Sequence, residues 1–137
     1  MATLTQKQDR ILQAFAQMLE YPHMEKITAT TLAAQAGVSR TSLYRTFPKR
    51  FQMFEAMIEF IEQTLFARIN QIQEKQEGGV AKIEHLLLLL LGFSQKNPGM
   101  TKILIGDVLV NEHQNLQSRI DQLHDRIEVT LKQALRF

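Results

Sequence analysis

Residues 27–50 read ITATTLAAQAGVSRTSLYRTFPKR, which is the spacing of two short helices around a tight turn. Thr28 has a hydroxyl that can cap the first free backbone amides of a helix, and the apolar positions after it recur at helical intervals. A first helix is therefore expected from about Ala29 to Ala36. Gly37 stands where a helix ends in a left-handed conformation, which glycine adopts without a Cβ clash. The chain is expected to turn there.

A second helix is expected directly after this turn. Ser39 is a second candidate N-cap, and Leu43 with Phe47 continues the buried face. Left on the exposed face and its flanks are Arg40, Thr41, Ser42, Tyr44, Arg45, Lys49 and Arg50. This is the pattern of a helix-turn-helix, whose second helix enters the DNA major groove. The alternative is an ordinary helical hairpin with solvated surface cations, because the spacing alone is only moderately specific.

The distribution of charge favours the DNA-binding interpretation. The whole chain has a net charge of +2, but residues 1–50 hold seven cations against three acids, a net charge of +4. Residues 51–137 hold nine cations against eleven acids, a net charge of −2. A basic N-terminal third is expected when one end of a molecule docks on phosphate.

The second predicted helix continues into Leu43-Tyr44-Arg45-Thr46-Phe47-Pro48-Lys49, and this extension resembles the DNA-binding domain of the TetR family of bacterial regulators. The first turn of a recognition helix lies nearest the base edges, so Arg40, Thr41 and Ser42 are the candidates for base contacts. The resemblance implies that Tyr44, Lys49 and Thr28 contact phosphates, and Arg45 and Arg50 could serve in either way. The predicted DNA-binding residues are Thr28, Ser39, Arg40, Thr41, Ser42, Tyr44, Arg45, Lys49 and Arg50. For Tyr44 the alternative is packing between the second helix of the helix-turn-helix and a helix predicted at residues 6–20.

The rest of the chain is also predicted to be helical, which gives an all-α, TetR-like fold. Apolar residues at steps of three and four predict helices at 6–20, 49–76, 81–96, 101–111 and from 114 onward. Residues 1–48 are expected to form the DNA-binding domain and residues 49–137 a helical domain for partner binding and dimerisation. The resemblance implies that the last two helices of the family are missing after Phe137.

Two apolar features of the second half are open to interpretation. The leucines 86–91 are too few to span a bilayer and predict a buried helix. The last helix repeats Leu116, Ile120, Leu123, Ile127, Leu131 and Leu135. A core-facing stripe and a dimer seam look the same at this length. A homodimer would place two recognition helices about 34–36 Å apart and recognise a palindromic DNA site.

A narrower resemblance, to the nucleoid occlusion factors within the TetR family, extends over nearly the whole chain. It is carried by residues 53–55, 58–62, 67–70, 87–93, 97–99, 103–104, 117, 119–120, 122–123 and 126–128. It implies a protein that binds many chromosomal sites and, on DNA, engages the C-terminal tail of the division protein FtsZ to block septum assembly. It also implies a cytoplasmic, nucleoid-associated protein, and the absence of cysteine fits a reducing compartment.

The resemblance places the FtsZ tail between the helices at 49–76 and 81–96. It implies apolar contact from Phe60 and Leu89, charge from Arg68 and Lys96, and close backbone approach at Gly92. Asn97 completes the predicted partner-binding set. Lys96 stands where the family has arginine, which keeps the charge but loses the two-pronged fork. Phe60 could instead cover the edge of the core, because helices inside a bundle are apolar on more than one face.

Other functional classes receive little support from the sequence. The four histidines are scattered without metal-ligand spacing, no glycine-rich phosphate loop is present, and Asp107 and Glu112 have no feature of a catalytic pair. We therefore predict no enzyme activity, no metal and no cofactor. A TetR-type repressor released from DNA by a small ligand remains the alternative function.

Overall fold

The computed structural model describes residues 5–20, 27–106 and 114–136. Within these residues all regular structure is helical, which confirms the predicted all-α fold. The helices are α1 (Gln6–Glu20), α2 (Ala29–Ala36), α3 (Arg40–Thr46), α4 (Arg50–Glu74), α5 (Gly79–Lys96), α6 (Pro98–Leu104) and α7 (Gln114–Leu135).

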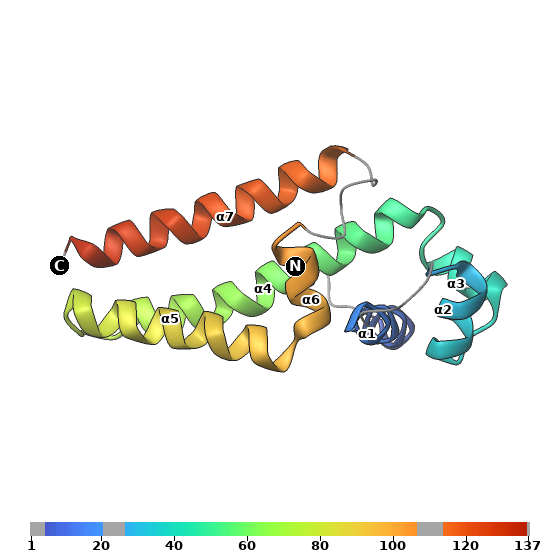
Figure 1. The fold of residues 1–137 in the computed structure, drawn as a ribbon, viewed down its shortest axis with the longest axis horizontal. Coiled ribbons are helices and arrows are strands. Elements are labelled where there is room, and N and C mark those ends of the chain that lie inside the picture. The colour runs from blue at the N-terminus through green and yellow to red at the C-terminus, as the bar shows by residue number, and fades with distance from the viewer. Residues whose placement is uncertain (1–4, 21–26, 107–113, 137) are drawn as a thin grey trace.

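The helices form a short N-terminal cluster on one end of a longer bundle (Figure 1). The helices α1, α2 and α3 gather near the start of α4, which then runs along the molecule beside an antiparallel α5. The helix α7 packs on α4 and α5, and α6 packs between α5 and α1. The turn between α4 and α5 therefore lies at the end of the molecule away from α2 and α3.

One continuous core joins the cluster to the bundle. Phe15 of α1 meets Phe54 of α4 edge to face, with ring centroids 4.9 Å apart and an interplanar angle of 87°. Further along α4, Met57, Ile58 and Ile61 are completely buried. The spacing of these residues at three and four positions is what places them on one face of the helix.

The helix predicted at 101–111 is in fact α6, and it is shorter and earlier than expected. It begins at Pro98, because proline fits the first helical position, where no backbone amide is needed. Asn97-Pro98-Gly99 therefore ends α5 and also starts α6. The predicted end at Asn111 lies outside the described residues.

Gly99 allows α6 to pack closely on α1. A Cβ atom at this position would lie 2.0 Å from the backbone carbonyl oxygen of Ala16. One turn later, the Lys102 Nζ atom donates to the carbonyl of Leu19 at 2.5 Å. Both contacts join α6 directly to the backbone of α1.

The leucine run was predicted to be buried, and this was largely wrong. Only Leu86 is buried, whereas Leu87, Leu88 and Leu91 are 47%, 59% and 61% exposed. The helix that carries them begins at Gly79, two residues before the predicted start. Within the described residues, no helix is both long enough and apolar enough to cross a membrane.

The apolar seam of α7 faces the core over most of its length, since Ile127 and Leu131 are partly buried and pack against the core. Leu116, Ile120 and Leu123 are buried, but Leu135 is 70% exposed. At the C-terminal end Thr130 and Ala134 are the buried residues instead. The buried face therefore rotates around the helix, since an α-helix has 3.6 residues per turn and a seam at steps of mostly four drifts.

Candidate functional site

The ends of α2 are fixed by the two residues that the sequence indicated. The Thr28 hydroxyl accepts a hydrogen bond from the Thr31 amide at 3.1 Å, and Thr31 Oγ1 accepts from the Thr28 amide at 3.0 Å. At the other end Gly37 has a φ of 71°, and its amide and that of Val38 bond to carbonyls of the last turn. These predictions of a capped helix and a left-handed turn are confirmed.

Arg10 of α1 has a structural role that the sequence did not reveal. Its Nη2 atom donates to the carbonyls of Ala36 and Gly37, both at 3.1 Å. These carbonyls lie at the C-terminal end of α2, where a helix has no partners of its own for them. One cation of the basic N-terminal third therefore holds α1 to the turn of the helix-turn-helix.

The first turn of α3 presents two of its three predicted base-reading side chains. Ser39 caps the helix by accepting from the Ser42 amide at 3.0 Å, as predicted. Arg40 and Thr41 are exposed. Ser42 was expected to be exposed as well, but its hydroxyl is buried and has no hydrogen-bond partner. The expectation was wrong because Ser42 lies next to Leu43 and is partly turned toward the core.

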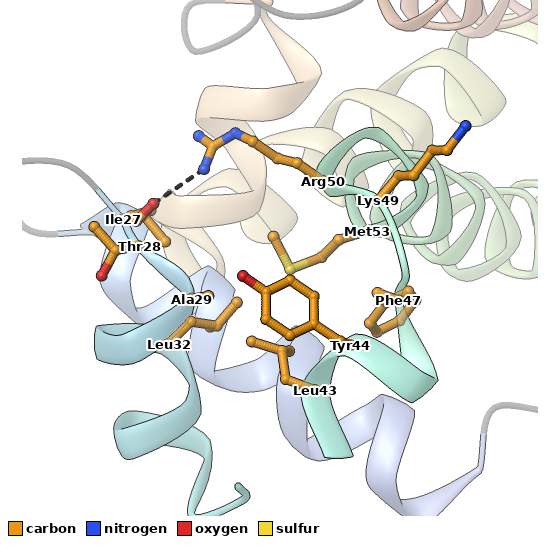
Figure 2. Close-up of a pocket in the computed structure, with 10 residues that line it drawn as sticks. All are labelled: Ile27, Thr28, Ala29, Leu32, Leu43, Tyr44, Phe47, Lys49, Arg50 and Met53. Atoms are coloured by element: carbon orange, nitrogen blue, oxygen red, sulfur yellow. Dashed lines mark hydrogen bonds between the residues drawn. The ribbon is translucent and has the colours of Figure 1, made fainter. Parts of the chain in front are cut away.

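Three exposed cations surround this surface. The side chains of Arg40, Arg45 and Lys49 form no hydrogen bond or ion pair with the part of the chain that the structure describes. Cations without internal partners can bind phosphate without first breaking an existing bond. Lys49, at the N-cap of α4, extends away from the neighbouring side chains (Figure 2).

Tyr44 stands at the edge of a hollow of about 270 Å³ between α2, α3 and the start of α4. Its side chain is 48% exposed, and its ring lies across the hollow with the hydroxyl turned away from the α3 backbone, toward the start of α2 (Figure 2). The hollow is lined by Ile27, Thr28, Ala29, Leu32, Leu43, Tyr44, Phe47, Lys49, Arg50 and Met53. The ring therefore lies toward α2 and α4, and not between α1 and α3, where the alternative placed it.

Arg50 is held within the protein more firmly than the sequence suggested. Its Nη1 atom donates to the carbonyl of Ile27 at 3.0 Å, and its guanidinium lies 5.3 Å from the ring centroid of Phe54. It was expected, like Lys49, to be an exposed DNA contact, and its side chain is indeed exposed. In the structure it clamps the start of α4 to the residue before the N-cap of α2.

A second candidate site is a groove between α4 and α5. Part of it is a hollow of about 300 Å³ lined by Thr64, Leu65, Arg68, Leu88, Leu89, Gly92, Phe93, Lys96 and Asn97. Five of the six predicted partner-binding residues are in this set. Gly92 leaves open space, because a Cβ atom there would have no neighbour within 4 Å apart from its own helix and chain neighbours.

The remaining predicted partner residue, Phe60, is not in this lining. It is partly buried and packs against the core, which matches the alternative given for it. Asn97 has a structural role besides its place in the groove: its Nδ2 atom donates to the Phe93 carbonyl at 3.1 Å, and its own carbonyl accepts from the Thr101 hydroxyl at 2.8 Å. It therefore joins the end of α5 to the start of α6.

Comparison with known proteins places this geometry in a family. Residues 77–137 match the family model of the tetracyclin repressor-like, SlmA-like C-terminal domain. In fold, the chain is similar to a TetR transcription regulator from Haloarcula marismortui, with a TM-score of 0.79 at 18% identity, over 97% of this chain and 70% of that chain.

Three curated relatives, each named nucleoid occlusion factor SlmA, match nearly the whole chain. The protein from Marinomonas sp. is 49% identical over 95% of this chain and 66% of its own length. Those from Alteromonas mediterranea and Sodalis glossinidius are 48% and 47% identical, over 96% and 98% of this chain and 68% of each relative. The chain thus spans about two thirds of the length of these relatives. It belongs to the TetR family of DNA-binding regulators, in the group of the nucleoid occlusion factors SlmA.

Proposed function

We propose that this protein is a nucleoid occlusion factor that binds palindromic chromosomal sites as a homodimer and, when bound to DNA, engages the C-terminal tail of FtsZ to block assembly of the division ring. The observation that carries the FtsZ part is the groove between α4 and α5. It brings Arg68, Leu89, Gly92 and Lys96 together around open space.

On the DNA side, α3 is the recognition helix. Arg40 and Thr41 read base edges from its first turn, and an arginine there can pair with guanine O6 and N7. Tyr44, Arg45 and Lys49 contact phosphates, together with the N-terminal end of α2 at Thr28. Ser39 positions the recognition helix by capping it. Ser42 does not contact DNA, because its hydroxyl is buried.

The two functions divide the chain at the start of α4, with residues 1–48 for DNA and residues 49–137 for partner binding and dimerisation, and Lys49 at the boundary also contacts DNA. This division concerns function, since α6 packs directly on α1 across it. We expect DNA binding to place the protein on the nucleoid in the cytoplasm.

Mapping of genomic binding sites tests the class of regulator. A nucleoid occlusion factor should occupy many sites spread unevenly around the chromosome, because its output depends on where DNA lies. A ligand-released TetR repressor should occupy a few promoters. The second pattern would contradict the proposal and favour the repressor.

Binding of a fluorescent FtsZ tail peptide, measured by anisotropy with and without duplex DNA, tests the partner. Gly92→Ala adds a methyl group into the open space of the groove and should weaken peptide binding about tenfold or more. Gly78→Ala is the matched control, because a Cβ atom there also has no neighbour within 4 Å and Gly78 is outside the groove lining. Absence of peptide binding in both states of the wild-type protein would refute the FtsZ assignment.

A further inference from the structure

The hollow that holds the predicted partner residues continues into a second hollow of about 840 Å³ along the same two helices. Both are lined by Thr64, Arg68, Leu88 and Leu89, so they form one groove. We call the part lined by Gly92, Phe93, Lys96 and Asn97 the near half. The part lined by Gln71, Ile72, Lys75 and His85 is the far half.

The far half extends away from the DNA-binding helices. Because α4 and α5 are antiparallel, it lies at the turn between them, at the opposite end of the molecule from α2 and α3 (Figure 1). At a rise of 1.5 Å per residue, Lys96 and His85 are about 16 Å apart along α5. An extended peptide advances about 3.3 Å per residue, so the whole groove accommodates roughly five residues.

Positive charge is distributed along the full length of this groove. Arg68, Lys75 and Lys96 are exposed, and their side chains form no hydrogen bond or ion pair with the described residues. Among the described residues that line either half, none is acidic. Glu77 lies nearby, but its Oε2 atom is paired with His85 Nδ1 at 3.0 Å.

An exposed apolar side chain lies between these cations. Leu88 is 59% exposed and lines both halves. Leu87 and Leu91 of the same helix are also exposed. The exposed apolar surface of α5 is therefore larger than that of a single surface leucine, which would need no explanation. Cations that alternate with leucine are complementary to a segment in which carboxylates alternate with apolar side chains.

We propose that the far half of the groove binds an acidic, apolar segment of the same partner chain, directly next to the tail in the near half. This inference rests on the proposed function, in which the near half holds the FtsZ tail. It extends the site predicted from Arg68, Leu89, Gly92, Lys96 and Asn97 along α4 to Lys75, about 10 Å beyond Arg68 at 1.5 Å per residue. Lys75 becomes a partner-binding residue that no resemblance indicated.

Two tail peptides test the inference on the whole protein by fluorescence anisotropy. The short one is the FtsZ tail alone, and the extended one adds about three residues, Asp-Leu-Asp, on the N-terminal side of the tail, which is the length that the far half accommodates at about 3.3 Å per residue. We expect the extended peptide to bind the wild type roughly tenfold more tightly. A peptide with Asn in place of each Asp should lose most of that gain.

Variants locate the contact. Lys75→Gln should remove the gain of the extended peptide and leave the affinity of the short peptide unchanged. Gly92→Ala should weaken both peptides. The matched control is Lys132→Gln, which removes one positive charge from an exposed position on α7, outside the groove. It should change the affinity of neither peptide.

Each other outcome contradicts part of the scheme. If the short peptide binds and the extended one binds no better, the inference fails while the proposed function stands. If neither binds, both fail. Loss of DNA affinity in Lys75→Gln, without loss of the gain, would make the far half a DNA contact. Dissociation of the dimer in Leu88→Gln, seen by sedimentation, would make a second copy of the chain the occupant of the groove.

Discussion

Replacing Gly99 by alanine should destabilise the protein through a single steric conflict between α6 and α1. The added Cβ atom would lie 2.0 Å from the carbonyl oxygen of Ala16 and 2.9 Å from its carbonyl carbon. Real Cβ atoms do not approach a backbone atom so closely, and α1 cannot yield locally because that carbonyl belongs to its helical ladder. The helix α6 must therefore move away from α1.

The magnitude follows from two opposing effects. Forcing extra methyl groups into packed cores costs about 1–3 kcal/mol, and an obstacle made of backbone places this case near or above the upper end. Alanine in place of glycine in a helix contributes about 0.5–1 kcal/mol in the other direction. We expect the free energy of unfolding to fall by roughly 2–3 kcal/mol, which at about 4 °C per kcal/mol lowers Tm by roughly 10 °C.

The assay is thermal unfolding followed by far-UV circular dichroism at one protein concentration, because the stability of a dimer depends on concentration. Gly92→Ala is the control: it makes the same chemical change in α5, where the Cβ atom meets nothing within 4 Å. It should leave Tm unchanged or raise it slightly. A Gly99→Ala protein that melts within about 2 °C of the wild type would refute the reasoning, as would an equal loss in Gly92→Ala.

Three further results are expected. Arg10→Met keeps the apolar stem but loses the bonds to the carbonyls of Ala36 and Gly37, so urea unfolding should show a loss of about 1 kcal/mol. Ser42→Ala removes a buried hydroxyl without a partner, so anisotropy with operator DNA should show affinity within about twofold of the wild type, and a larger loss would restore Ser42 as a base contact. If each subunit neutralises roughly four phosphates, the log–log slope of DNA affinity against salt should be about −7. Lys49→Gln removes one contact per subunit, so the slope of the dimer should become less steep by about 2. A wild-type slope near −2 would contradict these contacts.

The helix-turn-helix could be predicted almost residue by residue, because its determinants are local. Thr28 caps its helix through a residue three positions away, and Ser39 does the same. Gly37 acts through its own φ angle and the carbonyls of the preceding turn. Interactions over three or four residues follow from the order of side chains alone, so no knowledge of the tertiary structure was needed.

The roles of the arginines could not be predicted in this way. Arg10 and Arg50 bond to carbonyls 23 to 27 residues away in the chain. A sequence shows where a cation is but does not show which backbone oxygens the fold brings near it. The net charge of residues 1–50 is correct as a sum, but it overstates how many cations are available to phosphate.

The leucines 86–91 show the same limit for burial, and the reason is geometric. At 100° per residue, six consecutive positions sweep more than one full turn, so they point to every side of a helix. All six could be buried only if α5 were surrounded, whereas within the described residues it packs on α4, α6 and α7. These helices cover only part of the surface of α5, so some of the leucines must be exposed. The contacts of α5 determine that Leu87, Leu88 and Leu91 are exposed while Leu86 is buried. The sequence therefore predicts that α5 has more leucines than one buried face can hold. It does not predict which exposed leucine lines the groove. The position of α4 in the structure shows that Leu88 does.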